Sequence, residues 1–163
     1  WNDRGSLREV KAAISYSGLS SSMADRIVSH LNNLAKVANL RLEIEAQQVE
    51  ASEPGVFVTA WAVYERGVGG GAAMGAKGIR AETLAQSAFE ERFEWMSREA
   101  TVDPFVADQI LIPACLAEGP TTFKVSRLTQ RFLTTVWVVK QFTPIHVTVR
   151  GAENGPGTIS VRR

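Results

Sequence analysis

The stretch VDPFVADQILIPACLAEG, residues 102–119, combines a helix start with a long apolar run. Asp103 followed by Pro104 is typical of a helix start, because the aspartate can cap free backbone N–H groups and proline suits the first helical position. We expect the helix to bend at Pro113 and to end at Gly119. The apolar residues predict burial, and Asp108 with its neighbour Gln109 places a carboxylate and an amide near the beginning of this helix.

The chain downstream of this stretch alternates between predicted strands and helices. TTFKVS (121–126) is typical of a strand, and residues 129–142 have a helical pattern. HVTVR (146–150) and TISVRR (158–163) predict a hairpin around AENGPG. Residues 101–163 are therefore expected to form an α-β-α-β-β unit.

Residues 1–100 predict a β-α-β-β-(β)-α domain. REVKAAISYS (8–17) is expected to be a strand, and Ser20, Ser21 or Ser22 can cap the helix that follows. LRLEIEAQQVE (40–50) and VFVTAWAVYE (56–65) are expected to form an antiparallel hairpin. The glycine-rich connection 67–78 allows a short strand, and Ala81 to Arg98 has a helical period. We therefore predict an α+β fold with helices packed on mixed sheets, in two domains, 1–100 and 101–163.

The composition argues against a membrane-spanning, secreted or disulfide-linked protein. No run of about 18 apolar residues is present, so no transmembrane helix is predicted, and the polar start WNDRGSLREVKAA predicts no secretory signal. The single cysteine, Cys115, excludes an internal disulfide and favours a reducing, cytoplasmic environment. It lies in an apolar run, so we interpret it as a core residue.

Charge is distributed unevenly along the chain. Residues 1–119 hold 11 Lys+Arg against 16 Asp+Glu, whereas residues 120–163 hold 7 Lys+Arg and a single acid, Glu153. A basic segment of this kind can attract phosphate. It can also be a solvated surface that offsets the acidic part of the chain, and composition does not separate these two interpretations.

Common chemical motifs are not recognised. His30 and His146 lie far apart and no Cys/His spacing matches a zinc site, so no bound metal is expected. GVGGGAAMGAKG (67–78) contains Ala-Lys-Gly where a phosphate loop has Gly-Lys-Ser/Thr, so its glycines are interpreted as part of a tight β-turn.

Two polar groups near helix starts remain as candidate sites. Asp108 and Gln109 could hydrogen-bond a purine edge or ribose hydroxyls, or they could hydrogen-bond a neighbouring loop or strand. Arg131, Thr134 and Thr135 lie in the first two turns of the next helix, where free N–H groups and the helix dipole favour an anion. An arginine there adds a bidentate phosphate donor, or it is simply a surface residue.

These segments resemble the RNA 3′-terminal phosphate cyclases. VDPFVADQILIPACLAEG, FKVS and LTQRFLTTVWVVKQF resemble the family's C-terminal region, with its Asp-Gln pair followed by a strand and a Leu-Thr helix. DRGSLREVKAAISYSGLSSSMADR and YERGVGGGAAMGAKGIRAETLA resemble its inserted small domain, and HVTVRGAENGPGTISVRR resembles its closing hairpin. The resemblance covers nearly all of the chain. It implies that residues 1–100 are the inserted domain and that residues 101–163 are the closing part of the large domain.

The resemblance also implies a function. Family members convert an RNA 3′-phosphate to a 2′,3′-cyclic phosphate with ATP, through a histidine that becomes adenylylated. Asp108 and Gln109 match the family's nucleotide-contacting pair, whereas Arg131 stands at the position of the histidine and Thr135 at that of an asparagine. A guanidinium stays protonated and is a poor nucleophile. The implied phosphate- or RNA-binding residues are Arg131, Thr134, Thr135, Arg127 and Lys124.

Two interpretations remain open at this stage. The chain is either part of an ATP-dependent cyclase, whose remaining catalytic parts lie in an upstream half, or a non-catalytic RNA- or nucleotide-binding or assembly module. Its apolar helices also predict a homo-oligomer or a partner chain, since the closing region alone would expose an apolar face. No membrane partner is expected.

Overall fold

The computed structural model describes residues 1–163, and the chain folds as two compact units. The first unit comprises Leu7–Val63 and Gly70–Glu94. The second unit comprises Trp1–Ser6, Tyr64–Gly69 and Trp95–Arg163. None of the helices is both long and apolar enough to cross a membrane.

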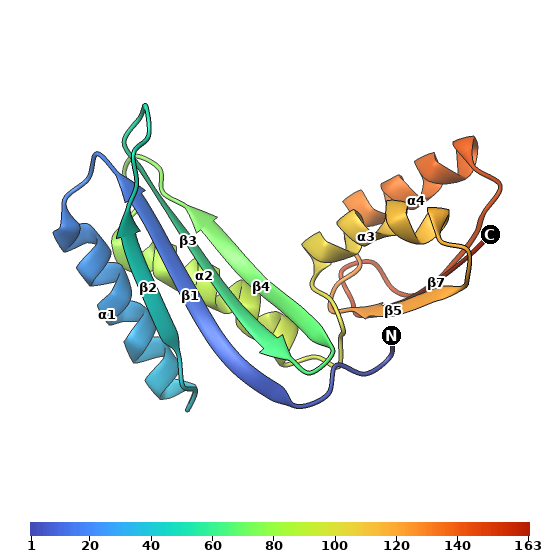
Figure 1. The fold of residues 1–163 in the computed structure, drawn as a ribbon, viewed down its shortest axis with the longest axis horizontal. Coiled ribbons are helices and arrows are strands. Elements are labelled where there is room, and N and C mark those ends of the chain that lie inside the picture. Colours follow the sequence, from blue (N-terminus) through green and yellow to red (C-terminus); the bar gives the residue numbers. More distant parts are fainter. The chain divides into compact units, whose positions relative to one another are not determined.

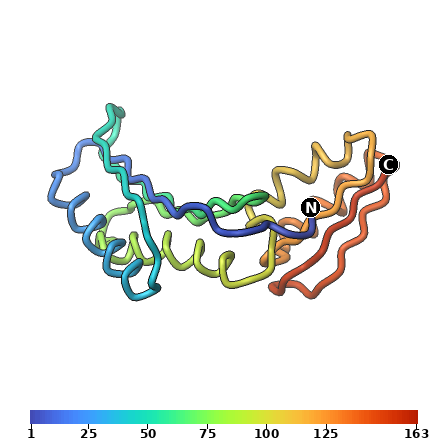
Figure 2. Tube along the Cα trace, turned by 60° about the horizontal axis from the view of Figure 1, so that its bottom comes forward, coloured from blue at the N-terminus to red at the C-terminus, as the bar shows by residue number.

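The first unit is built on a four-stranded sheet with the strand order β2-β1-β3-β4. Helices α1 and α2 cover the same face of that sheet (Figures 1 and 2). The elements are β1 (Leu7–Ser17), α1 (Ser21–Val37), β2 (Glu43–Gln48), β3 (Gly55–Tyr64), β4 (Gly67–Met74) and α2 (Ala81–Met96). This order matches the predicted β-α-β-β-(β)-α arrangement, including the short strand in the glycine-rich segment.

Alternation along the strands explains why only one face of this sheet is covered. Ala12 and Ile14 of β1 are buried against Ile27 and Leu31 of α1, and Val58 of β3 belongs to the same core. The residues between them point to the other face, because successive side chains of a strand alternate.

The predicted hairpin between residues 40–50 and 56–65 is wrong. β2 pairs in parallel with β1, in a register that runs from Lys11 opposite Glu43 to Tyr16 opposite Gln48. β1 therefore lies between β2 and β3. The physical reason is the α1 crossover, which returns the chain to the start of the sheet so that β2 can run beside β1 in the same direction.

The glycine-rich segment forms strand β4, and helix α2 approaches this strand closely. A β-carbon on Gly69 would lie 2.6 Å from the Trp95 ring, and one on Gly71 would lie 2.4 Å from Glu91 Cβ. The glycines of β4 are thus needed for packing against α2 rather than for the expected tight turn.

The second unit contains the other predicted elements in the predicted order. They are α3 (Pro104–Leu116), β5 (Thr121–Val125), α4 (Gln130–Phe142), β6 (His146–Gly151) and β7 (Gly157–Arg162). The sheet has the order β5-β7-β6 and is antiparallel throughout, so only the first sheet is mixed. The α+β class and the β6–β7 hairpin are confirmed.

One core joins the two helices and the sheet of the second unit. It is formed by Leu111 of α3, Phe132 and Val136 of α4, Phe123 of β5 and Ile159 of β7, all buried. α3 and α4 therefore lie on one face of the sheet (Figure 1). Its other face carries no helix of this unit.

Candidate nucleotide and phosphate site at two helix starts

The starts of α3 and α4 are fixed by side-chain caps. Asp103 accepts hydrogen bonds from the backbone N–H groups of Phe105 and Val106, both at 2.8 Å. Thr129 accepts from the N–H of Phe132 at 3.1 Å. The predicted helix start at Asp103 and Pro104 is confirmed. The helix ends at Leu116, before the predicted Gly119, and Pro113 lies inside it.

The two candidate groups meet at these helix starts. Arg131 of α4 forms an ion pair with Asp108 of α3, in which both Nε and Nη2 face the same carboxylate oxygen. The guanidinium carbon also lies 5.3 Å from the centre of the Phe105 ring. An arginine held by a carboxylate and an aromatic ring has a restricted orientation, so its position is prepared for an anion.

One carboxylate oxygen of Asp108 accepts no hydrogen bond within the protein. Its Oδ1 atom is buried and has no hydrogen-bond partner in the protein, while Oδ2 is the atom that meets Arg131. The Asp108 side chain is 16% exposed and that of Arg131 is 59% exposed. A buried acceptor without a donor is costly, and a ribose hydroxyl or an amino group of a base would supply the missing donor.

Among the other predicted site residues, Gln109, Thr134 and Thr135 form no side-chain hydrogen bond with the two ion-paired side chains. Gln109 and Thr134 are exposed on α3 and α4. The Thr135 hydroxyl donates to the Arg131 carbonyl oxygen at 2.9 Å, within the helix. Arg127 lies half-buried before α4.

Lys124 is separated from the Arg131–Asp108 pair. It lies on β5 between the buried Phe123 and Val125, so its side chain points to the sheet face opposite the helices. The structure thus brings Asp108 and Arg131 into contact and leaves Lys124 outside their site.

Phe105 is the site residue that sequence reasoning missed. The available signal was an aromatic residue three positions before Asp108, on the same helix face. Phe105 is 44% exposed even though the Arg131 guanidinium lies over its ring.

No group of three or more histidine, cysteine or acidic residues is positioned to hold a metal ion. Cys115 is buried at 3% exposure, and burial raises the pKa of its thiol. It has the environment of a core residue, as interpreted from the sequence.

Comparisons with known proteins give the family. Residues 2–97 match the family model described as RNA 3′-terminal phosphate cyclase (RTC), insert domain. A protein named RNA 3′-terminal phosphate cyclase from Gloeothece citriformis is 29% identical over 140 residues, which is 86% of this chain and 40% of that protein.

Two further relatives carry the same name. The protein from Methylococcus capsulatus is 29% identical over 97% of this chain and 44% of its own length. The one from Pyrococcus furiosus is 31% identical over 89% of this chain and 42% of its own length. The chain thus spans less than half the length of the relatives it matches. The family-model match covers more than half of the chain, and the chain therefore belongs to the RNA 3′-terminal phosphate cyclase family.

Proposed function

We propose that this chain binds ATP and the 3′-phosphate end of RNA in a cyclase-type protein, with Asp108 and Arg131 as binding groups. Asp108 would accept a hydrogen bond from the nucleotide through its free oxygen, and Arg131 would contact phosphate. The observation that carries the proposal is the ion pair itself, which joins an oriented guanidinium to a carboxylate with an unused buried acceptor. Family membership supports the substrate class.

In this proposal residue 131 does not become adenylylated. Arginine stays protonated in proteins and has no free electron pair with which to attack a phosphorus atom. The same guanidinium is well suited to stabilise phosphate charge non-covalently, through its remaining N–H donors.

We also propose that residues 1–100 are the inserted small domain and that residues 101–163 are the closing part of the large domain. The description of the family model matched by residues 2–97 supports the first assignment. In this arrangement the nucleotide site belongs to the closing part, and the inserted domain does not contribute Asp108 or Arg131.

Nucleotide binding tests the proposal directly. We expect Asp108→Asn to weaken ATP binding by roughly tenfold, the size expected for one lost hydrogen bond to a charged group. Glu118→Gln, which removes an exposed acid just beyond α3, is the matched control and should leave binding unchanged. The measurement is isothermal titration with ATP. Equal affinities for wild type and Asp108→Asn would contradict the proposed role of Asp108.

A second candidate function is complete ATP-dependent cyclisation, which family membership favours. Incubation with ATP followed by intact-mass measurement separates the two candidates. We expect no AMP adduct on the wild-type chain. If the Arg131→His variant forms an AMP adduct and the wild-type chain does not, the other groups needed for adenylylation are retained. An AMP adduct on Arg131 of the wild-type chain would refute the proposed role of Arg131 as a binding residue.

A further inference from the structure

The second sheet has an open face with an unusual set of side chains. The register places Thr122, Ser160 and Thr148 in one row across β5, β7 and β6. The next row contains Lys124, Thr158 and Arg150. A third, shorter row pairs Arg162 with His146. The intervening residues are buried under α3 and α4, so these eight side chains share the face opposite the helices.

Contacts confirm that these side chains are neighbours. The Thr122 and Ser160 hydroxyl oxygens are 3.2 Å apart. Lys124, Arg150 and Thr158 line one shallow hollow of about 230 Å³. Side chains on such a face repeat about every 4.8 Å across the strands and roughly every 6.8 Å along them. The face is therefore a regular grid of hydroxyl and cationic groups.

The charge of this face has a single sign. Its strands contain Lys124, Arg150 and Arg162 but no aspartate or glutamate. Acids occur only at its rim. Glu99 lines the hollow with Lys124 and Arg150, Glu118 lies near Arg162, and the Asp3 carboxylate is close enough to Lys124 to interact with it.

The chemistry of the face selects one kind of partner. Lysine, arginine, serine and threonine supply most protein contacts to phosphate and sugar oxygens of nucleic acids. None of the eight side chains is apolar, so the face lacks the groups that insert into a membrane or form the core of a protein interface. His146 is the only aromatic side chain among the eight, so the face offers a single ring on which a base could stack.

We propose that this open face of β5, β7 and β6 binds the sugar–phosphate backbone of single-stranded RNA, without sequence preference. It is a surface separate from the Arg131–Asp108 pair, which lies on the helix-covered side of the same sheet. It would hold the body of an RNA rather than its 3′ end, and the choice of RNA as the occupant rests on the proposed function.

The proposal predicts the salt dependence of binding. Three cations that contact three phosphates give a slope of roughly −2 in log K against log salt, which means an affinity loss of about 20-fold between about 50 and 200 mM salt. Lys124→Gln with Arg150→Gln should reduce that slope to about −0.7, since one contact remains. Affinity at low salt should fall accordingly.

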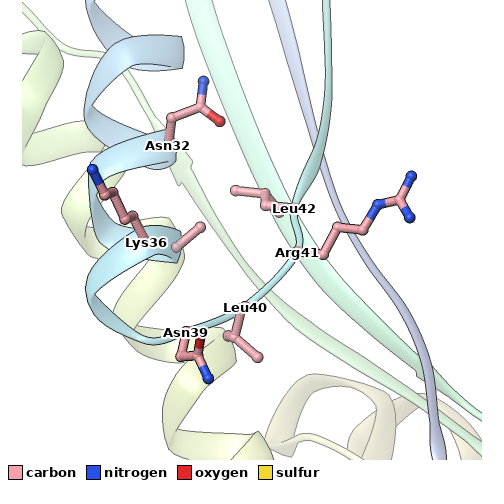
Figure 3. A pocket seen from close by; sticks show the side chains of 7 residues that line it. Asn32, Lys36, Asn39, Leu40, Arg41 and Leu42 are labelled. Atoms are coloured by element: carbon pink, nitrogen blue, oxygen red, sulfur yellow. The ribbon is translucent and has the colours of Figure 1, made fainter.

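A matched control exists in the first unit. Lys36 and Arg41 line a hollow beside the end of α1 with Asn32, Asn39 and Leu40. Figure 3 shows that their charged groups point away from each other, so they do not converge on one ligand. Lys36→Gln with Arg41→Gln removes the same charge as the test variant and should leave RNA affinity within about twofold, because only long-range attraction changes.

The experiment is fluorescence anisotropy with a labelled single-stranded RNA that ends in a 3′-hydroxyl, at several salt concentrations. Because this RNA has no 3′-phosphate, it does not depend on the proposed 3′-phosphate site. The result therefore tests the sheet face even if the proposed nucleotide site does not bind. Circular dichroism melts establish that both double variants remain folded. A Lys124/Arg150 variant that loses affinity while the Lys36/Arg41 variant retains it supports the proposal.

Three results would overturn it. The first is equal loss of affinity in both double variants, which would make the attraction non-local. The second is RNA binding that does not respond to salt. The third is binding to phosphatidylserine vesicles with no binding to RNA, which would identify an anionic membrane surface as the partner.

Discussion

At the scale of single residues, the family resemblance places Arg131 where cyclases have a histidine, and we expect the arginine to act differently. A histidine beside Asp108 could alternate between proton donor and nucleophile, because its pKa lies near neutrality. Arginine has no such second role, and contacts with Asp108 and Phe105 fix the direction of the Arg131 side chain instead. We therefore expect an arginine at this position to bind phosphate electrostatically rather than to form a covalent adduct.

Cys115 gives a prediction at the same scale. It is 3% exposed in the core of the second unit, and burial raises the pKa of its thiol. Thiolate is the reactive species, so we expect iodoacetamide to modify the folded protein at least about tenfold more slowly than the urea-unfolded chain at pH 8. Intact-mass measurement over time gives both rates. Equal rates would show that this core opens readily.

At the scale of elements, the packing of strand β4 against helix α2 requires a glycine at position 69. Gly69 lies directly beneath the Trp95 ring, and Trp95 is fully buried. Arg4 donates hydrogen bonds to the carbonyl oxygens of Trp95 and Ala100, at 3.1 and 3.2 Å, and its guanidinium lies 4.2 Å from the Tyr64 ring centre. These contacts hold the end of α2 in place, so Trp95 cannot easily move away from a larger residue at position 69.

Replacement of Gly69 by alanine is therefore expected to destabilise the protein. Its β-carbon would lie 2.6 Å from Trp95 ring atoms, and relief of such overpacking costs roughly 1–3 kcal/mol. Each kcal/mol lowers the Tm by about 2–4 °C in a protein of this size. Calorimetry measures the difference.

Gly55→Ala in β3 is the control for this prediction. A β-carbon there meets no atom within 4 Å. Replacing glycine without a clash restricts mainly the unfolded chain, so its Tm should stay the same or rise slightly. A Gly69→Ala variant as stable as Gly55→Ala would mean that α2 moves away from β4 at little cost.

At the scale of the whole molecule, the helices of the second unit leave an apolar surface uncovered. Leu116 of α3 is 66% exposed, and Trp137 and Phe142 of α4 are 65% and 83% exposed. Buried neighbours such as Leu111 and Phe132 form the core instead. Exposed apolar side chains on neighbouring helices are typical of interaction surfaces.

We predict that this surface makes the chain self-associate. Trp137→Glu should shift the sedimentation coefficient at micromolar concentration from that of an oligomer to that of a monomer, because a buried charge opposes association. Val37→Glu is the matched control, since Val37 is 88% exposed on α1, in the other unit. A wild-type chain that sediments as a monomer would refute self-association and favour a different polypeptide as the covering partner.

The sequence alone determined the local features of this protein. The Asp103–Pro104 helix start, the strands β1 and β3 and the β6–β7 hairpin follow from interactions between residues near one another in the chain, which is why they were predicted correctly. The family pattern also pointed to Asp108, Gln109 and Arg131, whose roles in binding stay a prediction. Burial of Cys115 followed from the apolar residues around it.

Only the tertiary structure decided which distant segments pair. The parallel β1–β2 register, the close approach of Trp95 to Gly69, the contact of Arg131 with Asp108 and the row that joins Lys124, Thr158 and Arg150 all bring together residues far apart in sequence. The strand pattern of residues 40–50 was compatible with either neighbour. The choice rested on how α1 and the core pack, which depends on the whole chain and not on any one segment.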